Sequence, residues 1–298
     1  MQKHEIKNLV LAEVQRLNTK QAVANKLGVS AATVSNVVNG KWTEITDRMW
    51  RKIASVLDYN PKGWQLVETT NIKMLNQIFL DAKSQNLFLA VSQKAGNGKT
   101  TGGRAYAAQH HTNAVFFLQC REWNRSQFLT EVCKMLGLAK EKNTTSEMMI
   151  ASVTEYLDQR NNDNPLIILD EADKLHPDAM RALIPLYNEL EDKVGMVIMG
   201  TDNLERDMLN GIKYKKKGYD EIYSRFGRQF INLYGATKTD CKAICKANGV
   251  SDAPTISKLF VECQPEQMQV GNQFVKMVTD LRKLKRAIQR EKLMAKAS

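Results

Sequence analysis

A glycine-rich stretch, AGNGKTT at residues 95–101, carries the residue types that bind phosphate groups. Two glycines let backbone N–H groups approach phosphates closely, Lys99 can reach the β and γ phosphates, and Thr100 can offer its hydroxyl to Mg²⁺. The full pattern G-x-x-x-x-G-K-[ST] has another glycine where this chain has Gln93. The closest phosphate contacts come from the later residues, so we predict an ATP site provided that Gln93 can adopt the local backbone geometry. The predicted nucleotide-binding residues are Ala95, Gly96, Asn97, Gly98, Lys99, Thr100 and Thr101.

The run PLIILDEAD, residues 165–173, would supply the other half of this site. A continuous apolar run that ends in carboxylates is typical of a buried parallel strand that delivers acids to the carboxyl edge of its sheet. We expect Thr100 and Asp170 to hold Mg²⁺ and Glu171 to orient and activate the attacking water. A third run, residues 195–201, ends in Thr201, whose hydroxyl could sense the γ phosphate.

The elements that must position these residues alternate between strand and helix. Strands are predicted in the runs 87–92, 114–120, 165–173, 195–201 and 229–233, with helices near 125–137, 145–159 and 177–190. Such alternation predicts an α/β domain with a parallel sheet. Arg225 precedes the last predicted strand and is a candidate arginine finger for the γ phosphate of a neighbouring subunit, which would require an oligomer. The alternative is a surface arginine in a salt bridge.

The N-terminal residues predict an all-α module. After a first helix from Glu5, the sequence at residues 20–41 suits a helix-turn-helix: Ala24 is small, Gly28 can take a positive φ, and Ser30 can cap the second helix of the motif. A fourth helix, capped by Thr46 or Asp47, is expected to bury four apolar residues, Met49, Ile53, Val56 and Leu57.

The outer face of this motif could enter a major groove of DNA, with Lys26 and Lys41 near the phosphates. The short side chains expected on that face are Ala31, Ala32, Thr33, Ser35 and Asn36. The face has no Arg or Gln, so reading of an operator, DNA binding without sequence preference and protein binding all stay open.

The net charge of +11 lies at the two ends of the chain: residues 1–66 hold ten Lys/Arg and five Asp/Glu, and residues 281–298 hold seven and one. Either a polyanion such as double-stranded DNA binds there, or these are solvated basic helices. We also expect the stretch GIKYKKKG, residues 211–218, to be a DNA-tracking loop, against the alternative of a solvated charge run. The predicted DNA contacts outside the helix-turn-helix are Lys213, Lys215, Lys216, Lys217, Arg282, Lys285 and Arg286.

At the C-terminus, an apolar stripe of Val278, Leu281, Leu284 and Ile288 is expected to be core, and the basic face of the same helix could bind DNA or an acidic partner. A break at Asn60–Gly63 predicts a linker. The expected domains are a helix-turn-helix at 1–66, the α/β core at 67–236 and a small helical lid at 237–298.

Five cysteines without a signal-peptide pattern favour reduced thiols in a cytosolic protein, and no apolar run is long enough to span a membrane. Cys241 and Cys245 could share a helix face, but nothing nearby completes a metal site.

In the order of its motifs AGNGKTT, LIILDEAD, VGMVIMGTDN and IYSRFGRQF, the chain resembles the AAA+ ATPases, and with its N-terminal helix-turn-helix it resembles the family of phage Mu transposition protein B (MuB). The resemblance runs from the first helix to about residue 246. It places the family's Walker lysine on Lys99, its Walker acids on Asp170 and Glu171, its sensor on Thr201 and its finger on Arg225.

The resemblance implies an ATPase that assembles into filaments on DNA with little sequence preference, selects target DNA and activates a transposase in the bacterial cytoplasm, associated with the nucleoid. Relatives often carry a Gly-x-x-Arg in the lid, where this chain reads Gly271-Asn272-Gln273-Phe274, so that sensor would be missing or displaced and hydrolysis slow. The alternatives are a helicase loader and a sequence-specific repressor with a regulatory nucleotide domain.

Overall fold

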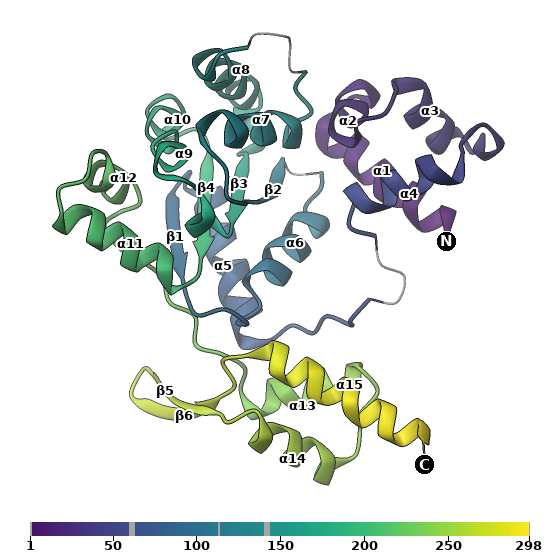
Figure 1. The fold of residues 1–298 in the computed structure, drawn as a ribbon, viewed down its shortest axis with the longest axis vertical. Coiled ribbons are helices and arrows are strands. Elements are labelled where there is room, and N and C mark those ends of the chain that lie inside the picture. The colour runs from purple at the N-terminus through teal and green to yellow at the C-terminus, as the bar shows by residue number, and fades with distance from the viewer. Residues whose placement is uncertain (1, 60–62, 113, 140–143, 298) are drawn as a thin grey trace.

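The computed structural model describes residues 2–59, 63–112, 114–139 and 144–297. Figure 1 shows three parts in chain order: an N-terminal helical bundle in purple, a central α/β part, and a smaller C-terminal part in yellow-green below it. Apart from Gly63, the predicted break at Asn60–Gly63 lies outside the described residues.

The N-terminal bundle contains the predicted helix-turn-helix. Its helices are α1 (Lys3–Leu17), α2 (Lys20–Leu27), α3 (Ala31–Asn39) and α4 (Asp47–Val56). Gly28 ends α2 with φ +64°, and the Ser30 side chain caps α3 by accepting a hydrogen bond from the Thr33 N–H. Of the two possible caps for α4, the structure uses Thr46. The local turn chemistry therefore folds as the sequence predicts.

Two predictions for this bundle are wrong. Val56 is 41% exposed, and the buried anchor of α4 is Trp50, whose indole packs edge-on against Trp42. Lys26 does not face outward: its Nζ lies 2.6 Å from Glu13 Oε2, in a cluster that also contains Arg16. Because a buried carboxylate needs charged partners, this lysine is committed to the interior.

That charged cluster lies where the bundle meets the α/β part. Arg16 Nη2 donates to the carbonyl of Ala107 at 2.5 Å, and Arg160 Nη1 donates to the carbonyl of Arg16 at 2.6 Å. Asn25 donates to the carbonyl of Gly137 at 3.0 Å. The bundle is thus held to the α/β part by buried hydrogen bonds as well as by apolar packing.

The central sheet consists of four parallel strands in the order β1-β4-β3-β2. They are β1 (Phe88–Ser92), β2 (Val115–Gln119), β3 (Leu166–Asp170) and β4 (Gly195–Gly200), as predicted. Helices α5 (Thr70–Ser84) and α6 (Lys99–Gln109) pack on one face. The other face is covered by α7 (Arg125–Met135), α8 (Ser146–Asp158), α9 (Pro177–Met180), α10 (Leu183–Leu190), α11 (Asp202–Lys213) and α12 (Tyr219–Arg225). The parallel arrangement brings the carboxyl ends of β1, β3 and β4 to one edge.

The predicted fifth strand, 229–233, is mostly wrong. Only Ile231 pairs with β1, through a single parallel bridge to Val91. Three and four residues later, the N–H groups of Tyr234 and Gly235 donate to the Asn71 side chain instead of extending a ladder. The segment turns away from the sheet there and enters the C-terminal part.

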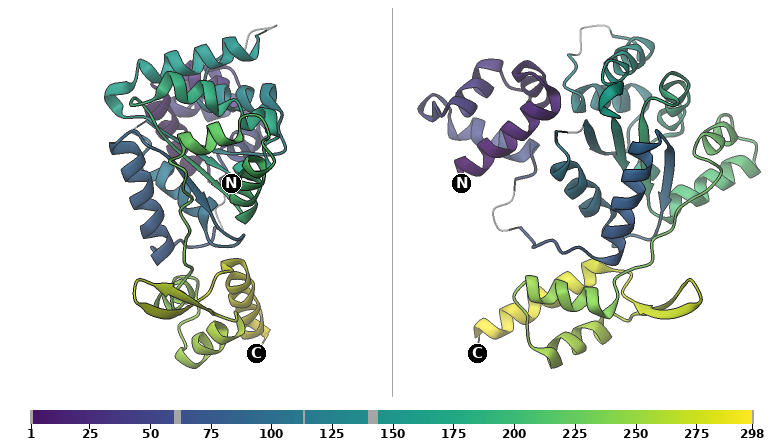
Figure 2. Two further views of the ribbon diagram at one scale, coloured as in Figure 1. Left: turned by 90° about the vertical axis from the view of Figure 1, so that its left-hand side faces the viewer. Right: turned by 180° about the vertical axis from the view of Figure 1, so that it is seen from behind.

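The C-terminal part was predicted to be helical, but it also contains a two-stranded hairpin. Its elements are α13 (Lys238–Ala247), α14 (Ala253–Glu262), a hairpin of β5 (Glu266–Val270) and β6 (Gln273–Met277), and α15 (Leu281–Ala297). Of the four residues in the predicted stripe, Val278, Leu284 and Ile288 are fully buried in the core, whereas Leu281 is half-buried against it. Figure 2 shows this part below the sheet in both views, with the beginning of the yellow helix α15 nearest to the sheet, so we call it the lid.

Candidate nucleotide site and DNA-contact surfaces

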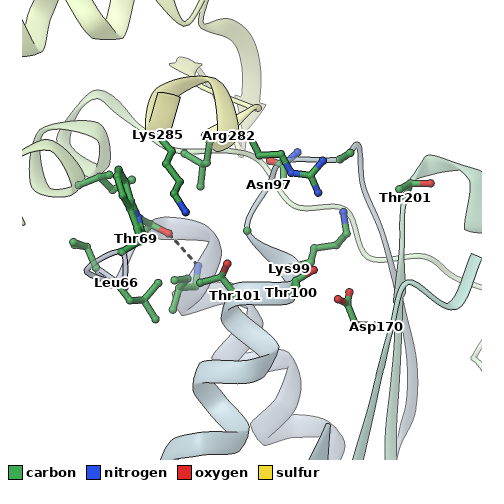
Figure 3. A pocket seen from close by; sticks show the side chains of 18 of the residues that line it. Leu66, Thr69, Asn97, Lys99, Thr100, Thr101, Asp170, Thr201, Arg282 and Lys285 are labelled. Atoms are coloured by element: carbon green, nitrogen blue, oxygen red, sulfur yellow. Dashed lines mark hydrogen bonds between the residues drawn. The ribbon is translucent and has the colours of Figure 1, made fainter. Parts of the chain in front are cut away.

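A cavity of about 370 Å³ lies between the glycine-rich loop, the carboxyl edge of the sheet and the lid. Figure 3 shows Lys99, Thr100 and Asp170 on the sheet side of this cavity, with Arg282 and Lys285 reaching in from the lid. The lining includes all seven predicted nucleotide-binding residues, 95–101, as well as Asp170, Glu171 and Thr201. The structure therefore brings together the residues that the sequence placed on three separate strands and loops.

The backbone of the glycine-rich loop has the geometry of a phosphate cradle. Gly96 and Gly98 have φ of +94° and +86°, which side chains with a Cβ rarely adopt. A Cβ on Gly96 would also lie 3.2 Å from the Asp280 Cα of the lid. Gln93 is not among the residues with positive φ, so its position in this loop does not require glycine. Helix α6 begins directly after Gly98 and points its free N–H groups at the cavity.

Lys99 is 7% exposed, and its ammonium donates to the carbonyls of Gln93 at 2.5 Å and Lys94 at 3.1 Å. Burial lowers the pKa of Lys99, while the nearby carboxylates of Asp170 and Asp173 act in the opposite direction. Among the described residues no carboxylate forms an ion pair with Lys99, so this cation is well suited to an anionic ligand.

Asp170 is 1% exposed, and within the described part of the chain its Oδ2 has no hydrogen-bond partner. Burial raises the pKa of Asp170, although a hydrogen bond from the Thr100 side chain lowers it. An orphaned carboxylate oxygen beside a hydroxyl fits Mg²⁺, which binds through one or two protein oxygens and completes its shell with phosphates and water. The residues present therefore fit the metal that the sequence predicted.

Glu171 is held by hydrogen bonds from its neighbours. Its Oε2 accepts from Lys174 Nζ at 2.7 Å and from Gln119 Nε2 at 3.0 Å. Burial alone would raise the pKa of Glu171, but the two hydrogen bonds outweigh it and lower the pKa. The carboxylate stays ionised and therefore keeps the proton-accepting form that a general base needs.

Thr201 caps α11 from the carboxyl end of β4, and Asp173 fixes its position. The Thr201 hydroxyl donates to Asp173 Oδ2 at 2.7 Å, and its N–H donates to Asp173 Oδ1 at 3.2 Å. Thr201 lines the cavity, but in Figure 3 its hydroxyl points away from Lys99 and Arg282. Asp173 was not predicted as part of the site.

The remaining walls come from segments that the sequence analysis did not assign to the site. Residues between the N-terminal bundle and α5 form an apolar wall, together with one residue of α13: Trp64, Leu66, Val67 and Ile244. Hydrogen bonds tie this segment to the lid, because the Asn248 amide pairs with both the N–H and the C=O of Gln65 at 3.0 Å.

Two residues predicted to bind DNA, Arg282 and Lys285, line the nucleotide cavity instead. They stand in the first two turns of α15, where the helix dipole disfavours cations unless an anion is near. Two basic residues near the start of a helix were therefore the feature of the sequence that could have indicated an anionic ligand there. Gly271, where the resemblance would place the lid sensor, lies in the hairpin turn between β5 and β6. The lid arginine that lines the cavity is instead Arg282, from α15.

Arg225 does not reach the cavity of its own chain. Its guanidinium donates to Asn188 at 2.8 Å, pairs with Glu221 at 2.9 Å and covers the Tyr187 ring. The side chain is only 17% exposed. These contacts favour the salt-bridge alternative within one chain, and a role in a neighbouring site requires their release.

The predicted DNA-contact residues form two separate surfaces. On α3, Ala32 is exposed, Ala31, Thr33, Ser35 and Asn36 are half-buried, and the following Lys41 is exposed. The acceptor Glu44 binds the Asn36 amide at 2.7 Å and places a negative charge beside this face.

The other surface follows α11: Lys213 ends the helix, and the turn after it contains Lys215, Lys216 and Lys217, all exposed. In Figure 1, α3 and the end of α11 lie on opposite sides of the molecule. Arg286 is exposed on the lid. A straight duplex on one face of a single chain therefore does not reach both surfaces.

All five cysteines are free and buried. Within the described residues, no cluster of three or more His, Cys, Asp or Glu could hold a metal ion. In the same part of the chain, none of the helices combines the length and apolar character needed to cross a membrane.

Comparison with protein families matches two segments of the chain. Residues 82–208 match the AAA domain, and residues 12–64 match a helix-turn-helix. A comparison with curated proteins gives no match. The chain therefore combines an N-terminal helix-turn-helix with an AAA-type α/β domain and a C-terminal lid.

Solved structures with a similar chain path include Cdc6p from Pyrobaculum aerophilum, with 17% identity, 68% of this chain and 57% of that chain covered, and a TM-score of 0.49. Domain III of the replication initiation protein DnaA from Thermotoga maritima has 15% identity, 78% and 87% coverage, and a TM-score of 0.47. The Thermotoga maritima RuvB Holliday junction branch migration motor has 14% identity, 75% and 70% coverage, and a TM-score of 0.36.

Proposed function

We propose that this chain is an ATPase whose bound ATP promotes assembly on double-stranded DNA. The observation that carries the proposal is the convergence of Lys99, Asp170 and Arg282 on one cavity beside the glycine-rich loop. A buried cation, a buried carboxylate with one oxygen unpartnered among the described residues, and a lid arginine together match the charge of a nucleoside triphosphate with its metal.

The residues divide the work as follows. The loop N–H groups and Lys99 bind the phosphates from the sheet side, and Arg282 and Lys285 bind them from the lid. Thr100 and Asp170 hold Mg²⁺, which when bound neutralises negative charge on the phosphates. The apolar wall that includes Trp64 excludes water from the base.

Glu171 is the proposed general base of hydrolysis. It can accept a proton from the attacking water only when an oxygen faces the γ phosphate, and Lys174 and Gln119 now occupy Oε2. Thr201 donates to the γ phosphate once its hydroxyl leaves Asp173. Arg225 is the proposed finger in a neighbouring site, after release from Asn188 and Glu221. Hydrolysis by the single chain is therefore slow.

DNA binding is proposed to use mainly phosphate contacts, from Lys41 beside α3 and from the lysines at 213–217. These two surfaces lie on opposite sides of one chain. A duplex would therefore contact both surfaces only in an oligomer whose subunits wind around the duplex. The further proposal, that the assembly marks target DNA and activates a transposase, is supported by the motif order combined with an N-terminal helix-turn-helix.

The test is ATP hydrolysis and ATP-dependent DNA binding by Lys99→Ala. Lys94→Ala is the matched control, because Lys94 lies in the same loop but its side chain is 64% exposed and points towards Glu266. We expect Lys99→Ala to lose both activities and Lys94→Ala to keep them. Equal DNA binding by wild type and Lys99→Ala, with or without ATP, would overturn the proposal.

A further inference from the structure

The departure from the phosphate-loop pattern, Gln93, lies where β1 ends and the loop begins. Up to this point the backbone of β1 is bonded to the segment that leads to the lid: Ile231 N–H donates to Ala90 at 2.8 Å, and Ser92 N–H donates to Ile231 at 3.1 Å. Ser92 donates the last of these bonds from the side of β1. In a continued parallel ladder, the next N–H to donate from that side would be that of Lys94, to the Leu233 carbonyl.

The Gln93 side-chain amide stands in place of that bond. Its Oε1 accepts from the Lys94 N–H at 3.0 Å, and its Nε2 donates to the Leu233 carbonyl. Its own backbone carbonyl accepts from Lys99 Nζ at 2.5 Å. The amide thus extends the sheet pairing by one step after the loop has turned away, which a glycine cannot do.

The residues after Leu233 form the connection between the α/β part and the lid. Asn71, which is 1% exposed, accepts hydrogen bonds from the N–H groups of Tyr234 and Gly235 at 3.2 and 3.0 Å. Ala236 then pairs with Val278 of the lid through two backbone hydrogen bonds, at 2.9 and 2.8 Å.

The lid also touches the loop directly. Leu281 N–H, at the start of α15, donates to the Gly96 carbonyl at 2.9 Å. One residue further, Arg282 enters the cavity. The loop is therefore joined to the lid in two places. One link runs through Gln93 and the connection at 233–236, and the other runs from Gly96 to the start of α15.

We propose that Gln93 is a positioning residue that fixes the lid against the phosphate loop, so that Arg282 and Lys285 are held over the nucleotide. This inference rests on the proposed ATPase function. It explains why the chain carries a glutamine at a position where the general pattern has a glycine. Restoring glycine should then weaken the site, although it makes the motif complete.

The test compares three variants of the full chain by hydrogen exchange and by steady-state hydrolysis. Gln93→Met keeps the size of the side chain without its hydrogen bonds, and Gln93→Gly restores the pattern. Gln77→Met is the control, because Gln77 is an exposed glutamine on α5 that bonds only locally, to Asp81. In both Gln93 variants we expect faster exchange at the amides of residues 234–236 and 281 and a KM for ATP raised about tenfold. Exchange at the amides of β3 should stay unchanged.

Exchange at 234–236 and 281 equal to that of wild type would overturn the proposal, as would a Gln93→Gly variant with a lower KM. If a Gln93 variant loses protection throughout, Gln93→Glu gives the second reading, because a carboxylate still accepts from Lys94 but cannot donate to Leu233. Its exchange must rise at 234–236 as well. The two proposals can fail separately, because hydrogen exchange needs no ATP. A wild-type chain that fails to hydrolyse ATP would refute the proposed function, but the exchange rates would still decide whether Gln93 fixes the lid.

Discussion

The contact between the phosphate loop and the lid can be broken with one methyl group. Gly96→Ala places a Cβ 3.0 Å from the Asp280 Cγ and 3.2 Å from its Cα, so the Asp280 side chain must move and the backbone where α15 begins must shift by a few tenths of an ångström. Positive φ alone costs an alanine about 1–2 kcal/mol. Displacement of α15 adds the loss of the Leu281 hydrogen bond, about 1 kcal/mol, and weaker charged contacts from Arg282 and Lys285 to the phosphates, about 2 kcal/mol.

We therefore expect Gly96→Ala to bind ATP with a Kd raised roughly 100-fold, since about 3 kcal/mol corresponds to a factor of that size. The matched control is Gly271→Ala. That glycine also has positive φ, +60°, and lies in the lid, but a Cβ there meets nothing within 4 Å. The control should bear the same backbone strain and bind ATP like wild type. Calorimetric titration with ATP measures both. A folded Gly96→Ala chain with a Kd within threefold of wild type would refute the reasoning.

Three further predictions follow from the geometry. Glu171→Gln should bind ATP normally but hydrolyse it at least about 100-fold more slowly, since general base catalysis contributes 10²–10⁴-fold, and should therefore prolong the DNA-bound state; release of phosphate at the wild-type rate would contradict this. Arg16→Ala leaves the buried Glu13 with one cation fewer and removes the bond to Ala107, so it should destabilise the chain by about 3 kcal/mol; a thermal melt like that of wild type would exclude the role given to this cluster. All five thiols are buried, and burial raises the pKa of Cys241 to about 12, so a thiol reagent at pH 8 should modify the native chain slowly and all five thiols after denaturation; rapid modification of Cys241, Cys245 or Cys263 in the native chain would contradict their burial in the lid core.

The sequence was sufficient where chemistry is local. The strand that ends in Asp170, the loop at 95–101 and the turn at Gly28 each follow from periodicity, residue type or φ preference over a few residues. Four strands and the helix-turn-helix were therefore predicted correctly.

Long-range contacts decided what was missed. Lys26 resembles a surface lysine until α1 brings Glu13 against it, and Trp50 displaces Val56 from the core because the bundle closes on that side of α4. The predicted fifth strand is reduced to the single bridge of Ile231 to β1, and beyond it the distant Asn71 binds the next backbone N–H groups, those of Tyr234 and Gly235. The lid hairpin was missed because its residues do not favour strands: three of the five residues in β5 are polar.

The same applies to the site. Arg282 was assigned to DNA because its helix is basic, and only the packing of the lid against Gly96 shows that it reaches the cavity. Gln93 could be recognised as an exception to a pattern, but its partner Leu233 lies 140 residues away. No local pattern encodes such a pair.

The most direct test of the account is binding to unrelated duplexes of increasing length, with ATP, with ADP and without nucleotide. We predict binding that needs ATP, strengthens with duplex length and is indifferent to sequence, because phosphate contacts from an oligomer carry it. Tight binding to one short sequence, equal in all three nucleotide conditions, would contradict the account and assign the function to the helix-turn-helix alone.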